Sequence, residues 1–484
     1  MAETAGVWIE HDPDVVTLVV ESILRAHGKV TPLPSNRSIF RVPEPMRVIK
    51  PEAYTPRLVS IGPFHRNDKH LKPMEAHKLR YLYDLLDRES PKNLGEPVNE
   101  KLGRCVEAMI EVEDKARRCY SETIEYEYRS YEFVHMMVVD GCFILEFILK
   151  TNFQEPASDP TWMTHVIKRD LLLLENQLPL FVLGRLYNLL INRTLSDCTF
   201  SDHVCCFLGS FTQSRRIYGT HMPHFNRAKE KFLQKGKTIP PSNKKEEEKV
   251  VDKEISEENF EQIFEAKHLL DFNRVLLIPS TTKKKGSRGK FGCCIRSATE
   301  LHHEALVKFQ RGSNNCLLGI TFTDGVLRIP SIRIEDFTET LLRNLIAFEQ
   351  SYEADDQHIT YYAAFLDGLI NTPEDVELLQ KMGIIQNLAR EPQEVAYLFN
   401  NLLKEVIIEE RKNYFSNICC EVNEYYGNQW NQRKASFYNN ITKWKASLME
   451  NYFNSPWAFI SFLAAVILLI LTAIQTFCSI KQVT

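Results

Sequence analysis

The sequence lacks the signatures of the common enzyme classes. Neither Gly-x-Gly-x-x-Gly nor Gly-x-x-x-x-Gly-Lys-Ser/Thr occurs, so neither loop whose glycines let a backbone approach phosphate is present. The Gly-x-Ser-x-Gly turn and the protein kinase motifs are also missing. His302-His303-Glu304 lacks the i, i+4 histidine pair that places two zinc ligands on one helix face. We therefore expect no enzyme, no cofactor and no metal site, although residues distant in sequence can assemble an active site without a motif.

The chain also lacks a strong charge of one sign and a cysteine framework. Its 59 Lys and Arg nearly balance 63 Asp and Glu, whereas nucleic-acid-binding proteins usually carry a basic excess, so we expect no nucleic-acid partner. The 12 cysteines form no Cys-x-x-Cys and include the adjacent pairs Cys205-Cys206, Cys293-Cys294 and Cys419-Cys420. Adjacent cysteines do not easily bridge each other, and this pattern predicts reduced thiols in a reducing compartment.

Long hydrophobic runs are rare. The N-terminus has no basic start followed by an apolar run, so no signal peptide is expected, and three N-glycosylation sequons are interpreted as chance matches. The apolar stretches at 138–149 and 171–190 are interrupted by charges that would be costly in lipid. One run differs. From Trp457 to Phe477 no residue is charged, and at 1.5 Å per residue such a helix would cross roughly 30 Å of hydrocarbon.

This run predicts a single transmembrane helix over 456–478, followed by a short tail over 479–484. Its partner is the lipid bilayer, which we expect to be contacted by Trp457, Phe459, Phe462, Leu468, Leu471 and Phe477.

The charges that flank this helix predict its orientation. Arg433, Lys434, Lys443 and Lys445 precede it, and only Lys481 follows it. Because cytosolic flanks are enriched in Lys and Arg, the N-terminal body is expected in the cytosol. The arrangement is that of a tail-anchored, single-pass protein of the plasma membrane or an endomembrane.

The rest of the chain predicts a mainly α fold. We expect a variable N-terminal segment over 1–35 with a short amphipathic helix, and a large helical body over 36–450. Within the body, 233–258 is rich in Lys and Glu and is expected to be a disordered insertion. Clustered prolines predict an extended segment over 36–64, and Asp324-Gly325 between two β-prone runs predicts a small β-hairpin.

Helical spacing continues through much of the body. Helices are predicted over 75–87, 99–121 and 130–150, after the Thr372-Pro373 cap, over 395–407, and beyond Gly427. We expect the last two to pack together as a helical hairpin that leads into the membrane span.

Residues 169–190 combine a leucine-rich run with a polar break. Pro179 interrupts a helix, so two helices are expected to meet at a corner there. Glu175, Asn176 and Gln177 would then bond the free backbone groups of the helix ends. A functional carboxylate site at Glu175 is the alternative.

Several blocks together resemble the plant family catalogued as domain of unknown function 247. These are VSIGPFHRNDKHLKPMEAHKLRYL (59–82), RDLLLLENQLPLFVLGRL (169–186), ATELHHEALVKF (298–309), LLRNLIAFEQ (341–350), DGLINTPEDVELLQKMGII (367–385) and SPWAFISFLAAVILLILTAIQTF (455–477). The resemblance runs from about Phe40 to Phe477. It implies a plant membrane protein and supplies no catalytic residues.

Some members of that family resemble self-incompatibility determinants of grasses, which implies a recognition surface. The leading hypothesis is therefore a membrane-anchored protein that acts in recognition or signalling by binding an unknown protein partner. The alternatives are a membrane-surface enzyme of unrecognised type, which would show a perturbed carboxylate or histidine in a deep pocket, and a trafficking or structural adaptor, which would show a large apolar groove.

Overall fold

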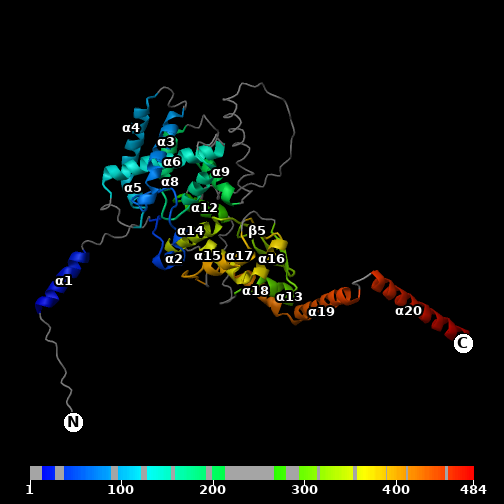
Figure 1. The fold of residues 1–484 in the computed structure, drawn as a ribbon. Helices are drawn as coiled ribbons and strands as arrows, with labels where there is room; N and C mark the ends of the chain where they lie inside the picture. Colours follow the sequence, from blue (N-terminus) through cyan, green and yellow to red (C-terminus); the bar gives the residue numbers. More distant parts are fainter. Residues whose placement is uncertain are drawn as a thin grey trace, which may run out of the picture.

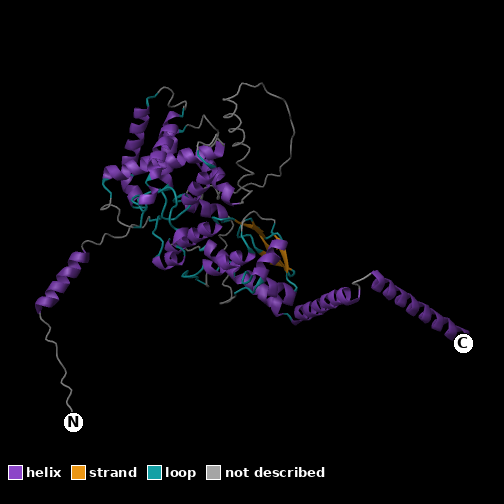
Figure 2. Cartoon of the chain, in the orientation of Figure 1, coloured by secondary structure: helices purple, strands orange, loops and turns teal. Residues whose placement is uncertain are grey.

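The computed structural model describes residues 13–27, 37–88, 96–121, 128–153, 159–191, 199–212, 266–278, 294–312, 317–352, 357–388, 390–409, 413–452 and 456–483. The predicted insertion at 233–258 lies outside these residues, as does all of the segment 1–35 except 13–27. The described chain is mainly helical, as predicted, with a few short strands (Figures 1 and 2).

The elements of the N-terminal half are α1 (Pro13–His27), α2 (Glu44–Ile49), η1 (Pro51–Ala53), η2 (Lys69–Leu71), α3 (Pro73–Asp87), α4 (Val98–Ile110), α5 (Glu113–Arg117), α6 (Ser130–Phe153), α7 (Thr161–Asp170), α8 (Leu180–Leu190), α9 (Phe200–Thr212) and α12 (Leu269–Leu277). The C-terminal half contains α13 (Ala298–Ala305), β1 (Lys308–Arg311), β2 (Thr321–Thr323), β3 (Val326–Ile329), β4 (Ile332–Ile334), α14 (Thr338–Ser351), α15 (His358–Leu369), α16 (Pro373–Lys381), β5 (Ile385–Asn387), α17 (Pro392–Leu402), α18 (Ser416–Gly427), α19 (Gln429–Tyr452) and α20 (Pro456–Val483).

Helix α6 is the centre of the N-terminal half. It is apolar all round and buried along nearly its whole length, as expected for a helix surrounded by others. Helices α3, α4, α8 and α9 pack against it (Figure 1). Its two buried acids are paired: Asp140 with Lys78 of α3 at 2.8 Å, and Glu146 with Arg88 at 2.6 Å. These pairs explain why a helix too charged for lipid can lie in a protein core.

The C-terminal half packs α14, α15 and α17 together, with α16 against α17. Helix α12 contacts both α9 and α14 and so joins the two halves (Figure 1). A single cluster of buried apolar side chains runs from Ile39 to Val422. The two halves therefore share one core.

The predicted hairpin is present. β2 and β3 pair antiparallel across Asp324 and Gly325, which have φ values of 51° and 74°, the left-handed values that a tight hairpin turn requires. The sequence did not predict that β1 adds to β3 in parallel, or that β4 and β5 form a second, parallel sheet. Such short strands are set by distant partners and leave little local pattern.

Three predicted segments, one extended and two helical, differ from the structure in extent. The segment 36–64 contains α2 as well as extended chain, and the predicted helix over 99–121 is divided into α4 and α5 at Val112, so that α5 packs on α6. Helix α17 ends at Leu402, short of the predicted 407. There the Gln350 side chain accepts from the Ile407 N–H and donates to its carbonyl, each at 3.0 Å, which replaces the helical partners of Ile407.

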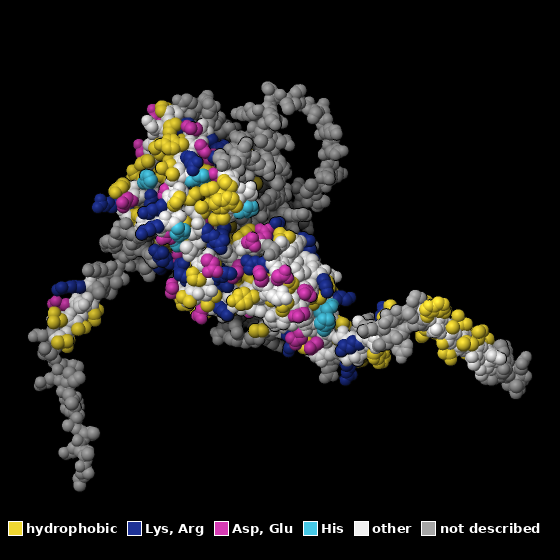
Figure 3. All heavy atoms as spheres, viewed as in Figure 1, with side chains coloured by type: hydrophobic (Ala, Val, Ile, Leu, Met, Phe, Trp, Pro, Cys, Tyr) yellow, Lys and Arg dark blue, Asp and Glu magenta, His cyan; other side chains and the backbone are white. Residues whose placement is uncertain are grey.

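The C-terminal helices extend away from the body (Figures 1 and 3). Helix α19 packs mainly on α13 and α18, so the predicted hairpin with α17 was wrong. Helix α20 contains an 18-residue stretch, Phe459–Thr476, of mean hydropathy 2.4 with none of it buried in the protein. By length and composition it can cross a membrane, and it continues beyond the predicted end at 478.

Candidate functional site

The polar block that follows α7 lies at the centre of the body. Helix α7 ends at Asp170, the chain turns through a buried loop, and α8 begins at Leu180. Pro179 has the extended φ and ψ of −56° and 134°, and its ring prevents the loop from joining α8 as one helix. The three polar side chains before it, Glu175, Asn176 and Gln177, are at most 1% exposed.

Asn176 joins α7 to the N-terminal segment. Its Oδ1 accepts from the Ile61 N–H at 2.6 Å, and its Nδ2 donates to the carbonyls of Val59 and Asp170 at 3.0 and 2.9 Å. The Val59 and Ile61 groups belong to chain outside any helix or strand, and Asp170 is the last residue of α7. A buried backbone group left without a partner is costly, so this side chain holds residues 59–61 in place.

Gln177 closes the loop on itself. Its Nε2 donates to the carbonyls of Leu171 and Leu173 at 2.8 and 2.7 Å, and its Oε1 accepts from Leu270 of α12 at 3.3 Å. Gly62, with φ of 71°, lies against the backbone carbonyl of Gln177, and a Cβ at position 62 would be 2.6 Å from that backbone oxygen. Close approach of the two loops thus requires glycine at position 62.

Glu175 is surrounded by donors. Its Oε1 accepts from the Val42 N–H at 2.6 Å and from the Arg47 guanidinium, and its Oε2 lies 3.1 Å from His65 Nε2. Burial alone would raise the pKa of this carboxyl. The hydrogen bond from His65, the charge of Arg47 and the Val42 N–H together hold its pKa below the usual value. Glu175 is therefore an ionised, fully bonded anchor for residues 42–65.

These three side chains use their hydrogen bonds on the protein itself. Asp170 adds to them by accepting from the backbone N–H groups of Arg57, Leu58 and Val59. The block joins α7, the N-terminal segment and α12 into one unit. Because all four side chains are buried and bond the protein's own groups, a structural role is the simplest account of this geometry.

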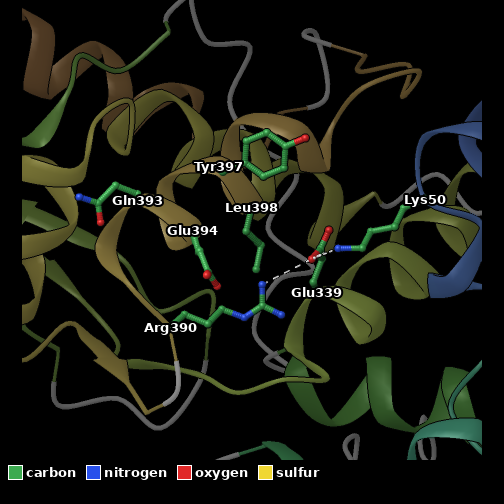
Figure 4. Close-up of a pocket in the computed structure, with 7 residues that line it drawn as sticks. All are labelled: Lys50, Glu339, Arg390, Gln393, Glu394, Tyr397 and Leu398. Atoms are coloured by element: carbon green, nitrogen blue, oxygen red, sulfur yellow. Dashed lines mark hydrogen bonds and ion pairs between the residues drawn. The ribbon is translucent and has the colours of Figure 1, made fainter.

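A second group of polar side chains surrounds an open hollow of about 430 Å³ where three segments meet (Figure 4). Lys50 comes from the N-terminal segment, Glu339 from α14, and Arg390 from the loop before α17. The rest of the lining belongs to α17: Gln393, Glu394, Tyr397 and Leu398. The sequence motifs gave no sign of this site, because its members are up to 348 positions apart in the chain, from Lys50 to Leu398.

Three cations share the carboxylate of Glu339. Lys50 Nζ lies 2.6 Å from Oε2, Arg343 Nε lies 3.0 Å from Oε1, and Arg390 Nη1 lies 3.7 Å from Oε2. Burial tends to raise the pKa of Glu339, but the hydrogen bonds from Lys50 and Arg343 lower it overall. Arg390 makes the longest of the three contacts and also donates to the Asp336 carbonyl at 3.4 Å.

Buried histidines with perturbed pKa values have structural positions. Burial lowers the pKa of both His203 and His268 to about 4. His268 is the N-cap of α12: its Nδ1 accepts from the Asp271 N–H at 3.2 Å, and its Nε2 donates to the Ser38 carbonyl at 2.9 Å. His203 packs between the rings of Phe153 and Tyr187. Neither lines the hollow described above.

The possible metal ligands point elsewhere. His302 Nδ1 lies 3.0 Å from the Val307 carbonyl, and Glu304 accepts from the Tyr426 hydroxyl. Within the described ranges, no three His, Cys, Asp or Glu side chains are grouped to hold a metal ion.

The cysteines differ in state. Seven of the described cysteines are free, whereas Cys420 is disulfide-bonded. The prediction that the thiols are reduced was therefore wrong for Cys420.

Comparison with known proteins identifies the family of this chain. The family described as plant protein of unknown function matches residues 39–471, from the start of the body into α20. The chain belongs to this plant family. The resemblance predicted from the sequence blocks is thereby confirmed, and the matched range covers the residues of both the buried polar block and the hollow.

Two curated members of the group come from Arabidopsis thaliana. UPF0481 protein At3g47200 is 32% identical over 90% of this chain and 85% of its own length. A second UPF0481 protein, At3g02645, is 25% identical over 91% of this chain and 89% of its own length. No solved structure matches the chain significantly.

Proposed function

We propose that this family member is a single-pass, membrane-anchored plant protein that acts in recognition or signalling by binding another protein, as a self-incompatibility determinant would. The observation that carries the proposal is the combination of α20, whose stretch Phe459–Thr476 is apolar and unburied, with a body that presents an open hollow lined by charged, aromatic and apolar side chains. The anchor, the binding surface and the orientation are separately testable.

The anchor rests on the free energy of transfer. In α20 the side chains of Phe459, Phe462, Leu468 and Leu471 are all 53% or more exposed. A contiguous apolar surface of this length is unfavourable in water and favourable in a bilayer. Trp457, 76% exposed at the start of the helix, suits the interface with the headgroups.

The first expected result concerns Leu468→Arg combined with Leu471→Arg. Each charge at the middle of the span costs roughly 2.5–3.5 kcal/mol of insertion, so most of the chain should leave the membrane fraction. Alkaline carbonate extraction of plant microsomes measures this partition. The matched control, Leu468→Ile with Leu471→Ile, should stay in the pellet. A wild-type chain that the carbonate wash releases would refute the anchor.

The binding surface is proposed at the hollow. Arg and Tyr are enriched among the residues that dominate binding at protein interfaces, and here Arg390 and Tyr397, which is 70% exposed, both line the hollow. Leu388, two residues before Arg390, is 59% exposed. Because Lys50, Arg343 and Arg390 surround one buried carboxylate, an incoming acidic side chain can pair with Arg390. The surface therefore fits a protein segment that combines an acidic and an apolar side chain.

The second expected result compares Arg390→Glu/Tyr397→Ala with a control, Arg311→Glu/Tyr83→Ala, whose exposed residues lie elsewhere on the body. Proximity labelling in the native tissue should identify proteins that the wild type and the control label equally. The hollow variant should label these proteins several-fold less, because the loss of a hot-spot residue costs about 2 kcal/mol or more of binding free energy. Identical labelling by all three chains would place the partner surface elsewhere. A wild-type set of general membrane residents alone would refute the recognition proposal.

We propose a cytosolic body from the charges that flank the apolar stretch of α20, four cations before it against Lys481 after it. The disulfide at Cys420 opposes this, because disulfides in cytosolic proteins are rare and usually redox-sensing. The third expected result distinguishes a cytosolic body from one outside the cytosol. In sealed, right-side-out plasma-membrane vesicles the body should resist added protease, and detergent should make it sensitive. Digestion without detergent would place the body outside the cytosol.

A further inference from the structure

Helix α19 connects the body to α20 and has two different sides. On one side the Ala435 side chain is fully buried, and Asn439 Nδ2 donates to the His303 carbonyl of α13 at 2.8 Å. These contacts fix the start of the helix on α13 and α18.

The opposite side carries an apolar stripe. Trp430, Phe437, Ile441 and Trp444 follow at separations of seven, four and three residues, which places them along one face of a helix. Ala435 and Asn439 are each two residues from Phe437, or about 160–200° around the helix. The stripe therefore faces away from α13. Its members are 76%, 64%, 43% and 71% exposed, so the body does not cover them.

Cations border this stripe. Arg433 and Lys434 lie four and three residues before Phe437, and Lys445 lies four residues after Ile441, so all three are neighbours of the stripe on the helix surface. All are exposed. Helix α19 contains four Lys and Arg and a single acid, Glu450. A helix with aromatic side chains on one face and cations at its edges is suited to the surface of an anionic membrane.

The short connection between α19 and α20 keeps α19 near a membrane surface. Tyr452 ends α19 and Pro456 begins α20, so the two helices are joined by three residues, which span at most about 14 Å. If α20 crosses a bilayer, the end of α19 lies within about 14 Å of the residue at which α20 begins, and so close to the membrane surface.

We infer that α19 binds in the interface of the membrane that α20 spans. Its stripe of Trp430, Phe437, Ile441 and Trp444 enters the headgroup region, and Arg433, Lys434 and Lys445 bind anionic phospholipid. This inference rests on the proposed anchor. The inference goes beyond the anchor because it holds the body close to the bilayer and names the lipid class that α19 binds.

A second copy of the chain fits this stripe less well. Two parallel helices joined through it would bring Arg433, Lys434 and Lys445 of both chains to the edges of one seam. Like charges at those positions repel, whereas phospholipid headgroups of opposite charge attract them.

The test uses tryptophan quenching in the full chain, reconstituted in vesicles of phosphatidylcholine with or without phosphatidylserine. Subtracting the emission of Trp430→Phe/Trp444→Phe from that of the wild type isolates the two stripe tryptophans, and Trp457→Phe isolates the anchor tryptophan in the same way. Lipids brominated near the headgroup should quench the stripe emission about twofold or more in the vesicles that contain phosphatidylserine, and aqueous acrylamide should quench it little.

A charge variant tests the lipid class. Arg433→Gln/Lys434→Gln/Lys445→Gln should lose the quenching that depends on phosphatidylserine. Lys69→Gln/Lys72→Gln/Lys381→Gln, which removes three exposed lysines of the body, should retain it.

Three outcomes overturn the inference. If acrylamide quenches the stripe and brominated lipid does not, while Trp457 is quenched by brominated lipid, α19 lies in water and the anchor still stands. If the stripe is shielded from both quenchers and the chain cross-links as a dimer, a second copy covers it. If brominated lipid fails to quench Trp457 as well, the anchor itself is refuted.

Discussion

Replacing Asn176 by leucine should remove most of the stability of the body. Leucine is close to asparagine in size but offers no polar atom, so the Ile61 N–H and the Val59 carbonyl would lose their buried partner. The Asp170 carbonyl would keep only the Leu173 N–H, at 3.4 Å. Each such group costs about 1–3 kcal/mol, so we expect a loss of roughly 4 kcal/mol or more, against a typical domain stability of about 5–15 kcal/mol. Urea unfolding of the full chain in detergent, followed by far-ultraviolet circular dichroism, measures this.

The control is Asn400→Leu on α17. Asn400 is exposed and donates a single hydrogen bond, to the Asn371 carbonyl at 3.0 Å, so its loss should change the unfolding free energy by less than about 0.5–1 kcal/mol. An Asn176→Leu chain that unfolds at the wild-type urea concentration would show that the polar block is dispensable to the fold.

The polar block around Asn176 shows how much of the candidate site the sequence could predict. Pro179 predicted the break between α7 and α8, and Glu175, Asn176 and Gln177 were recognisable as polar groups at that break, because these are local rules of backbone chemistry. Their partners were not predictable. Ile61 and Asn176 are 115 residues apart, and no local pattern states that they meet.

The same distinction applies to other elements. The turn at Asp324-Gly325 and the Thr372–Asp375 capping box depend on neighbouring residues, and both are present. Helix α17 follows its hydrophobic spacing only to Leu402: Glu405 has a left-handed φ of 60°, and Gln350, 57 residues before Ile407, binds the backbone of Ile407. The hollow at Glu339 collects Lys50 and Arg390 from three segments, and such a site is assembled by tertiary structure alone.

The second large effect is a loss of stability in mild acid. His203 and His268 have pKa values of about 4 in the folded protein against 6.5 in an unfolded chain. Between these values the unfolded state binds more protons than the folded state, so the unfolding free energy falls as pH falls from about 6.5 to about 4. At 1.36 kcal/mol per pKa unit, each histidine contributes roughly 3 kcal/mol to this loss. Buried carboxyls whose pKa is raised by burial, such as Glu349, oppose it at the acid end of the window.

The slope of the unfolding free energy against pH counts the protons involved, at about 1.4 kcal/mol per pH unit for each. His203 and His268 should therefore contribute about two protons to the uptake on unfolding near pH 5, and His268→Asn should take up about one proton fewer than the wild type. Asparagine retains an acceptor for the Asp271 N–H and cannot gain a proton, so the slope separates titration from the mere loss of a helix cap. His303→Asn, on the exposed side of α13, should leave the slope unchanged. Equal slopes for the wild type and His268→Asn would mean that His268 titrates normally in the folded protein and that burial does not control its charge.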